Sequence, residues 1–226
     1  MVPVGARARR RLRHNPVARS LRAAVLTGVD GLEQLVVRRD ADCPPRRLRG
    51  VGAGDFRAVG NALVDQLVLT AGLRPDHHVI DIGCGSGRLA LPLTNFLRRG
   101  RYEGFDIDPD MIAWCRRSIT PRHPDFGFSL VDVANSHYNP GGAVTAGDVR
   151  FPFADGRFDM AVATSLFTHL LPASVENYAG ETSRVLAAGG TLFATFCLVD
   201  DVALDGIARG AAKVDLRHRV RDAAGV

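Results

Sequence analysis

Short apolar runs alternate with helical patterns along most of the chain. Five buried strands are predicted at residues 79–82, 102–105, 126–131, 158–163 and 191–198. Helices are predicted between them at residues 88–97, 109–117 and 172–186. Asp108 followed by Pro109 marks one helix start, and Gly189-Gly190 ends the last helix. The alternation predicts an α/β fold of right-handed βαβ units, with helices on both faces of a parallel sheet.

Upstream of the first strand, the pattern predicts one further helix within the body of the protein. Asp55 is a plausible N-cap, apolar residues recur at helical spacing after it, and Gly72 ends the run. A weaker helical pattern covers residues 17–37, and the proline- and glycine-rich stretch 43–54 reads as a linker. We therefore expect three parts, which are a basic N-terminal extension and linker (1–54), a core (55–200) and a short tail (201–226).

Charge is concentrated at the start of the chain, where residues 1–50 hold 12 Arg against four acidic residues. Nucleic acid is nevertheless disfavoured as a partner, because 28 of the 29 basic residues are Arg and the segments after the strands lack interleaved basic and aromatic residues. The apolar run 23–29 is too short for a secretory signal. The sequence also has no apolar run near the roughly 18 residues that span a bilayer.

The four cysteines, Cys43, Cys84, Cys115 and Cys197, are widely scattered. No pair has the spacing of a zinc site, so we expect no metal. Scattered thiols are typical of a reducing compartment, which predicts a cytoplasmic protein.

The chemistry is concentrated where the first strand runs into three glycines and then a helix, in Val79-Ile80-Asp81-Ile82-Gly83-Cys84-Gly85-Ser86-Gly87-Arg88. Glycines allow a sharp turn and the close approach of a ligand. Asp106 ends the second strand, 19 residues after Gly87. A carboxylate at this offset can accept hydrogen bonds from both hydroxyls of a ribose. Together the two features indicate a nucleoside-containing cofactor.

The spacing of the glycines distinguishes a motif for NAD from a motif for S-adenosylmethionine. The dinucleotide fingerprint Gly-x-Gly-x-x-Gly would need glycine where Arg88 stands. The glycines at 83, 85 and 87, with Asp81 before them, resemble the first motif of class I S-adenosylmethionine-dependent methyltransferases. The resemblance extends from about residue 73 to 197, through the stretches 147–159 and 185–192. It implies a Rossmann-like, doubly wound sheet of order 3-2-1-4-5.

Carried over to this chain, the resemblance implies a set of cofactor-binding residues. Gly83, Cys84, Gly85 and Gly87 would line the methionine end, Asp81 would help to hold the amino group, and Asp106 would bind the ribose.

Two acidic residues compete for the adenine amine. Asp132 directly follows the third strand, whereas Asp148 has the usual position before Phe151-Pro152-Phe153. We favour Asp132, because the strand end fixes its distance from the cofactor. The choice is ambiguous because of an apparent insertion at 133–146, which we interpret as a surface loop.

Methyl transfer to a hydroxyl needs a general base, and the segment after the fourth strand supplies a candidate. His169 lies where the sulfonium methyl should point, at the carboxyl ends of the strands. We therefore predict O-methylation of a small-molecule, glycosylated or lipid-like acceptor, with His169 as base. His137 is an unplaced second candidate, and His77 and His78 are expected to be solvated.

The chain departs from the family after the fifth strand, where the residues that follow 198 are few and charged. The final antiparallel hairpin of the sheet is therefore predicted to be missing, which would leave an edge open to homodimerisation. The loss also keeps a second hypothesis open, a non-catalytic S-adenosylmethionine-binding remnant or regulatory subunit. An NAD-dependent oxidoreductase is the weaker enzyme alternative.

Overall fold

A five-stranded sheet forms the centre of the protein. The computed structural model describes residues 43–49, 54–135, 138–196 and 200–211. The strands are β1 (His78–Ile82), β2 (Arg101–Asp106), β3 (Phe126–Leu130), β4 (Phe158–Ala163) and β5 (Leu186–Ala194). All four neighbouring pairs are parallel, and the order is β3-β2-β1-β4-β5. The predicted fold class and strand order are confirmed.

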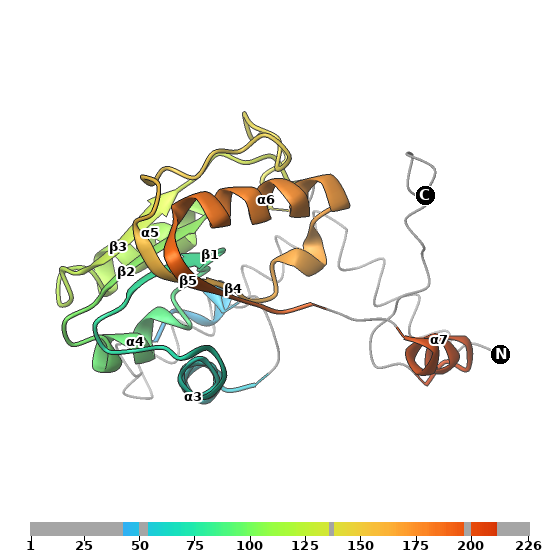
Figure 1. Cartoon of the computed structure of the whole chain (residues 1–226), viewed down its shortest axis with the longest axis horizontal. Coiled ribbons are helices and arrows are strands. Elements are labelled where there is room, and N and C mark those ends of the chain that lie inside the picture. Colours follow the sequence, from blue (N-terminus) through green and yellow to red (C-terminus); the bar gives the residue numbers. More distant parts are fainter. Residues whose placement is uncertain (1–42, 50–53, 136–137, 197–199, 212–226) are drawn as a thin grey trace.

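Helices cover both faces of the sheet and define two apolar cores (Figure 1). On one face, α3 (Phe56–Ala71), α4 (Ala90–Phe96) and α5 (Pro109–Ser118) pack against alternate strand residues such as Val79 and Met160. On the other, α6 (Pro172–Val185) packs on Ile80, Ile82 and Ala161. This alternation follows from the strand period of two, since successive side chains point to opposite faces.

The helix ends follow the capping residues of the sequence. The Asp55 carboxylate accepts a hydrogen bond from Ala58 N at 2.9 Å, and Gly72 closes α3 in the left-handed conformation at φ 69°. Asp108 accepts hydrogen bonds from Asp110 N and Met111 N at the start of α5. Two short 3₁₀ helices, η1 (Arg46–Leu48) and η2 (Phe167–His169), precede α3 and α6, and α7 (Asp201–Ala208) buries none of its residues.

The fifth strand begins earlier than predicted. Leu186 pairs with Phe158, yet the next pairing joins Thr191 to Met160, so four residues of β5 stand opposite one residue of β4. Gly189, at φ 79°, lies in this irregularity. The two glycines therefore form a bulge inside the strand, where the sequence had suggested a stop before it.

Two further segments differ from expectation. Part of the predicted linker, 43–49, packs on the body, because Cys43 and Leu48 are buried in the core beneath α3–α5. His77, expected to be solvated, is 7% exposed, and its Nδ1 is the only buried side-chain polar atom without a partner in the described ranges. Burial lowers its pKa. The helix predicted at 17–37, residues 50–53, His137, Cys197 and the tail from 212 lie outside the described residues.

Candidate functional site

A cavity of about 290 Å³ opens at the carboxyl ends of the strands. Its lining combines the turn after β1, the ends of β2, β3 and β4, the start of α3 and the inner face of α6. Ligands of parallel α/β sheets bind at this edge. The segment 43–49 reaches the same cavity, because the Ser86 hydroxyl donates a 2.8 Å hydrogen bond to Leu48 O and fastens that segment over the glycine turn.

The glycine turn adopts a backbone that other residues rarely take. Gly83, Gly85 and Gly87 have φ angles of 79°, 54° and 80°. A Cβ on Gly85 would meet only Met111 Sδ, at 3.7 Å, whereas a Cβ on Gly87 would lie 2.8 Å from Ile119 Cδ1. Gly83, Cys84 and Gly85 line the cavity, and Gly87 does not. Gly85 thus leaves room for a ligand, while Gly87 allows the turn to pack on α5.

Asp81 provides a buried carboxylate at the end of β1. It is 2% exposed and lines the cavity, and the Tyr102 hydroxyl donates a hydrogen bond to its Oδ2 at 2.6 Å. Tyr102 is held in turn by the stacked ring of Phe126, with ring centroids 5.2 Å apart. Burial raises the pKa of Asp81 to about 7. The group can therefore gain or lose a proton near neutral pH when a charged ligand arrives.

Asp106 is held in place by backbone amides at the end of β2. Its Oδ2 accepts from Gly85 N at 2.8 Å, and its Oδ1 accepts from Asp108 N at 3.0 Å. Burial raises its pKa, and the side chain lines the cavity. Each carboxylate oxygen can accept a second hydrogen bond, so Asp106 offers two fixed acceptor positions. The structure thus brings the predicted Asp81, Asp106 and glycine turn together.

The two candidates for adenine lie elsewhere. Neither Asp132 nor Asp148 lines the cavity, and both are exposed. Asp132 accepts from Asn139 Nδ2 at 3.0 Å, and Asp148 accepts from Thr145 Oγ1 at 2.6 Å. Both carboxylates stabilise the connection between β3 and β4.

His169 stands on the other side of the cavity, in η2 after β4. Its imidazole is exposed and lines the cavity, with the Tyr138 ring nearly perpendicular to it at a centroid distance of 6.5 Å. Ser165, between β4 and η2, is the one non-glycine residue with positive φ (55°) in the described ranges, and its N–H donates to Thr195 Oγ1 at 2.8 Å. Such strain is commonly found at functional sites.

Several cavity residues were missed by the sequence reasoning. The connection 133–146, predicted as a surface loop, contributes Val133, Tyr138 and Ala146 to the wall. Tyr178 lines the cavity from α6, and Tyr102 supports Asp81 from β2. A tyrosine at a buried strand or helix position was an available signal, because its hydroxyl needs a partner when buried.

Other kinds of site receive no support from the described residues. Across residues 43–49, 54–135, 138–196 and 200–211, no three His, Cys, Asp or Glu side chains come together as metal ligands. Among the helices of these ranges, none combines the length and hydropathy needed to cross a bilayer. Cys43, Cys84 and Cys115 are buried, and Cys84 and Cys115 form no disulfide.

Comparison with known proteins gives a consistent result. A family described as "Methyltransferase domain" matches residues 80–194, just over half of the chain. A fatty-acid O-methyltransferase from Mycolicibacterium smegmatis is 34% identical over 113 residues, which are 50% of this chain and 34% of that protein. A demethylmenaquinone methyltransferase from Thermus thermophilus is 31% identical over 114 residues, 50% of this chain and 44% of that protein. The matches thus span less than half the length of these relatives.

Solved structures with a similar arrangement include a TehB-like S-adenosylmethionine-dependent methyltransferase from Corynebacterium glutamicum. It is 21% identical, with a TM-score of 0.47, over 73% of this chain and 77% of that chain. The PH0226 protein from Pyrococcus horikoshii is 22% identical, with a TM-score of 0.49, over 64% of this chain and 59% of that chain.

Proposed function

The chain belongs to the methyltransferase-domain family, whose cofactor is S-adenosylmethionine, and from that premise we propose that it methylates an oxygen atom of a small or lipid-like acceptor. One observation carries the proposal. The buried carboxylate of Asp81 and the half-buried carboxylate of Asp106 flank an open glycine turn at the carboxyl edge of the sheet, inside one cavity. This is the set of groups that a cationic nucleoside cofactor requires.

The cofactor residues fit their proposed roles. The two oxygens of Asp106 would accept hydrogen bonds from the ribose hydroxyls, and its hold on Gly85 N fixes its position. Asp81 would face the ammonium group of the methionine end, with Tyr102 occupying one of its oxygens. The space beside Gly85 would admit the chain between them. Gly87 would act through packing. Asp132 and Asp148, the candidates for the adenine amine, do not line the cavity.

When bound, S-adenosylmethionine supplies an electrophilic methyl group, which the acceptor oxygen takes as the C–S bond breaks and its electrons remain on sulfur. The protein must align the acceptor and exclude water. His169 would take the proton of an acceptor hydroxyl through a ring nitrogen facing the cavity. An acceptor carboxylate would carry no such proton, so His169 would then only orient it.

The acceptor class is supported by the lining and by one relative. Leucine and phenylalanine side chains line the cavity, with Leu48, Phe56 and Leu63 from one apolar core and Leu166 and Leu170 from the other. Such walls suit an apolar acceptor. A relative named fatty-acid O-methyltransferase shares 34% identity over 113 residues.

The proposal includes two further points. A homodimer is supported by β5, which pairs only with β4 among the described strands and leaves one backbone edge unpaired. A cytoplasmic location is supported by Cys84 and Cys115, two buried cysteines that form no disulfide.

The direct experiment measures transfer of a labelled methyl group from S-adenosylmethionine to a panel of fatty acids, phenols and sugar hydroxyls. With a hydroxyl acceptor, His169→Ala should lower kcat by roughly a hundredfold or more and leave cofactor affinity unchanged. His123→Ala, a histidine outside the cavity, is the matched control. A loss below threefold would remove His169 as base. Cofactor binding without transfer to any acceptor would favour the non-catalytic alternative.

A further inference from the structure

The hydroxyl of Tyr178 has no role in the proposed methyl transfer. The residue is 4% exposed on the inner face of α6, and its ring packs edge-on against Phe151 at a centroid distance of 5.2 Å. The Tyr178 hydroxyl has no hydrogen-bond partner in the described structure. Among the described residues, His77 Nδ1 is the only side-chain polar atom that is fully buried and has no partner, so the Tyr178 hydroxyl is not fully buried. Because Tyr178 lines the cavity, its hydroxyl opens onto that cavity.

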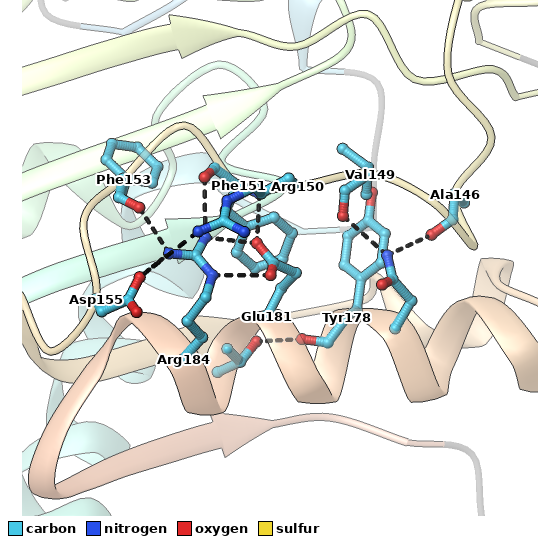
Figure 2. A network of polar contacts seen from close by, with 11 residues as sticks. Ala146, Val149, Arg150, Phe151, Phe153, Asp155, Tyr178, Glu181 and Arg184 are labelled. Atoms are coloured by element: carbon cyan, nitrogen blue, oxygen red, sulfur yellow. Dashed lines mark hydrogen bonds and ion pairs between the residues drawn. The ribbon is translucent and has the colours of Figure 1, made fainter.

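The helix that carries Tyr178 is firmly attached to the segment before β4 (Figure 2). Arg184 donates to Phe151 O at 3.0 Å and pairs with Glu181, whose carboxylate accepts from Phe151 N at 2.6 Å. One residue before Tyr178, Asn177 Nδ2 donates to Val149 O at 2.9 Å. The ring therefore has a fixed position, and its hydroxyl is an oriented group.

The residues of the core around Tyr178 indicate which part of the cavity lies near its side chain. Tyr178 belongs to the same apolar core as Val131 and Val133, and Ile107 packs against that core. These three residues follow the ends of β3 and β2 and, like Tyr178, line the cavity. Asp106, the proposed ribose ligand, is near enough to add to the effect of burial, and the two raise the pKa of Tyr178 to about 12. The hydroxyl therefore stays protonated and can donate a hydrogen bond at physiological pH.

We propose that the Tyr178 hydroxyl donates a hydrogen bond to a ring nitrogen of the cofactor's adenine, between the apolar walls formed by Ile107 and Val133. This rests on the proposed function, in which Asp106 holds the ribose. Adenine ring nitrogens accept hydrogen bonds and suit a donor that has no partner within the protein. The carboxylates expected to meet adenine, Asp132 and Asp148, do not line the cavity. Tyr178 supplies the missing polar contact.

The first test is calorimetric titration of Tyr178→Phe with S-adenosylhomocysteine. We expect Kd to rise about 3- to 10-fold, the range for one neutral hydrogen bond, without a loss of thermal stability because the removed hydroxyl had no partner. Thr182→Val is the matched control on the same helix face. Its hydroxyl donates to Tyr178 O at 2.6 Å, so this variant should lose stability and keep its affinity.

The second test identifies the acceptor atom with 1-deaza, 3-deaza and 7-deaza analogues of S-adenosylhomocysteine. For one of them, the wild type and Tyr178→Phe should bind with equal affinity, because the analogue lacks the nitrogen that Tyr178 contacts. Wild-type affinity in Tyr178→Phe for S-adenosylhomocysteine would overturn this role alone. An undiminished effect with all three analogues would also overturn it. Failure of the wild type to bind S-adenosylhomocysteine at all would overturn the proposed function with it.

Discussion

The two sides of the cavity are built in different ways. On the cofactor side, four of the five residues of β1 are buried, and the carboxylates of Asp81 and Asp106 are fixed by hydrogen bonds of 2.6–3.0 Å. On the proposed acceptor side, His169 is exposed on a 3₁₀ turn after the strained Ser165. The first side is therefore preorganised for one ligand, while the second has side chains that can adapt to an acceptor.

The strongest test of this contrast is removal of the preorganised carboxylate. Asp106→Ala would delete two charge-assisted hydrogen bonds to the ribose, each typically about 1.5–3 kcal/mol, so affinity for S-adenosylmethionine should fall at least 100-fold. The matched control is Asp110→Ala, four residues later, exposed and outside the cavity. Equal affinities of Asp106→Ala and wild type, measured by calorimetry, would contradict the assignment.

The glycine turn provides a second test of the contrast between the two sides of the cavity. Gly85→Val should place a side chain in the open space beside Met111 and lower cofactor affinity at least 10-fold. The positive φ adds a strain of about 1–3 kcal/mol, so the variant should also melt earlier while still folding cooperatively. Gly141→Ala, with nothing near its Cβ position, should change neither quantity. If Gly85→Val unfolds globally, the glycine serves the turn alone.

A third prediction concerns pH and follows from Asp81. Its folded-state pKa is about 7 against an ordinary value of 3.8, so the folded protein holds this proton more tightly than the unfolded chain. The stability that this contributes is full below about pH 4 and is lost as pH rises towards 7. Denaturant unfolding at several pH values should show the decline in the wild type and a flatter profile in Asp81→Asn.

The same carboxylate should link cofactor binding to protons. An ammonium group favours the charged form of Asp81, so affinity for S-adenosylhomocysteine should rise with pH up to about 7. Below that pH, binding should release a proton, which calorimetry in buffers of different ionisation enthalpy detects. Proton release of equal size in Asp81→Asn would assign the proton to another group.

The smallest expected effect lies at the edge of β5. Leu192 is 38% exposed on this strand, and Leu192→Lys should weaken self-association, because a charge on an edge strand opposes pairing with a second sheet. Light scattering across a concentration series should show dimers for the wild type and fewer for the variant. Leu69→Lys, on an 83% exposed position of α3, should leave the dimer unchanged. A monomeric wild type at all concentrations would refute this edge contact.

The same contrast explains which features could be predicted from the sequence. The strands and the caps at Asp55 and Asp108 depend on local patterns, and each cap lies directly beside its helix. The cofactor side could be predicted because Asp81 stands within the glycine motif and Asp106 ends a strand. The wall formed by 133–146 and the packing of 43–49 depend on contacts between distant segments. The sequence did not indicate Tyr178, because a tyrosine at a buried helix position predicts core packing. Its place on the cavity wall can be seen only in the structure.

The bulge in β5 was missed for a related reason. A pair of glycines after a helix is a usual helix stop, and the sequence does not tell whether the strand begins before or after it. The pairing of Leu186 with Phe158 decides this, since it places the glycines inside the strand.

Titration calorimetry of the full chain tests whether the cavity at the carboxyl edge is a site for S-adenosylmethionine. S-Adenosylhomocysteine and NAD would be titrated separately into the wild type and Asp106→Ala. We expect saturable binding of S-adenosylhomocysteine to the wild type, at least 100-fold weaker binding to Asp106→Ala, and no binding of NAD. Saturable binding of NAD, or no binding of S-adenosylhomocysteine to the wild type, would contradict this assignment of the site.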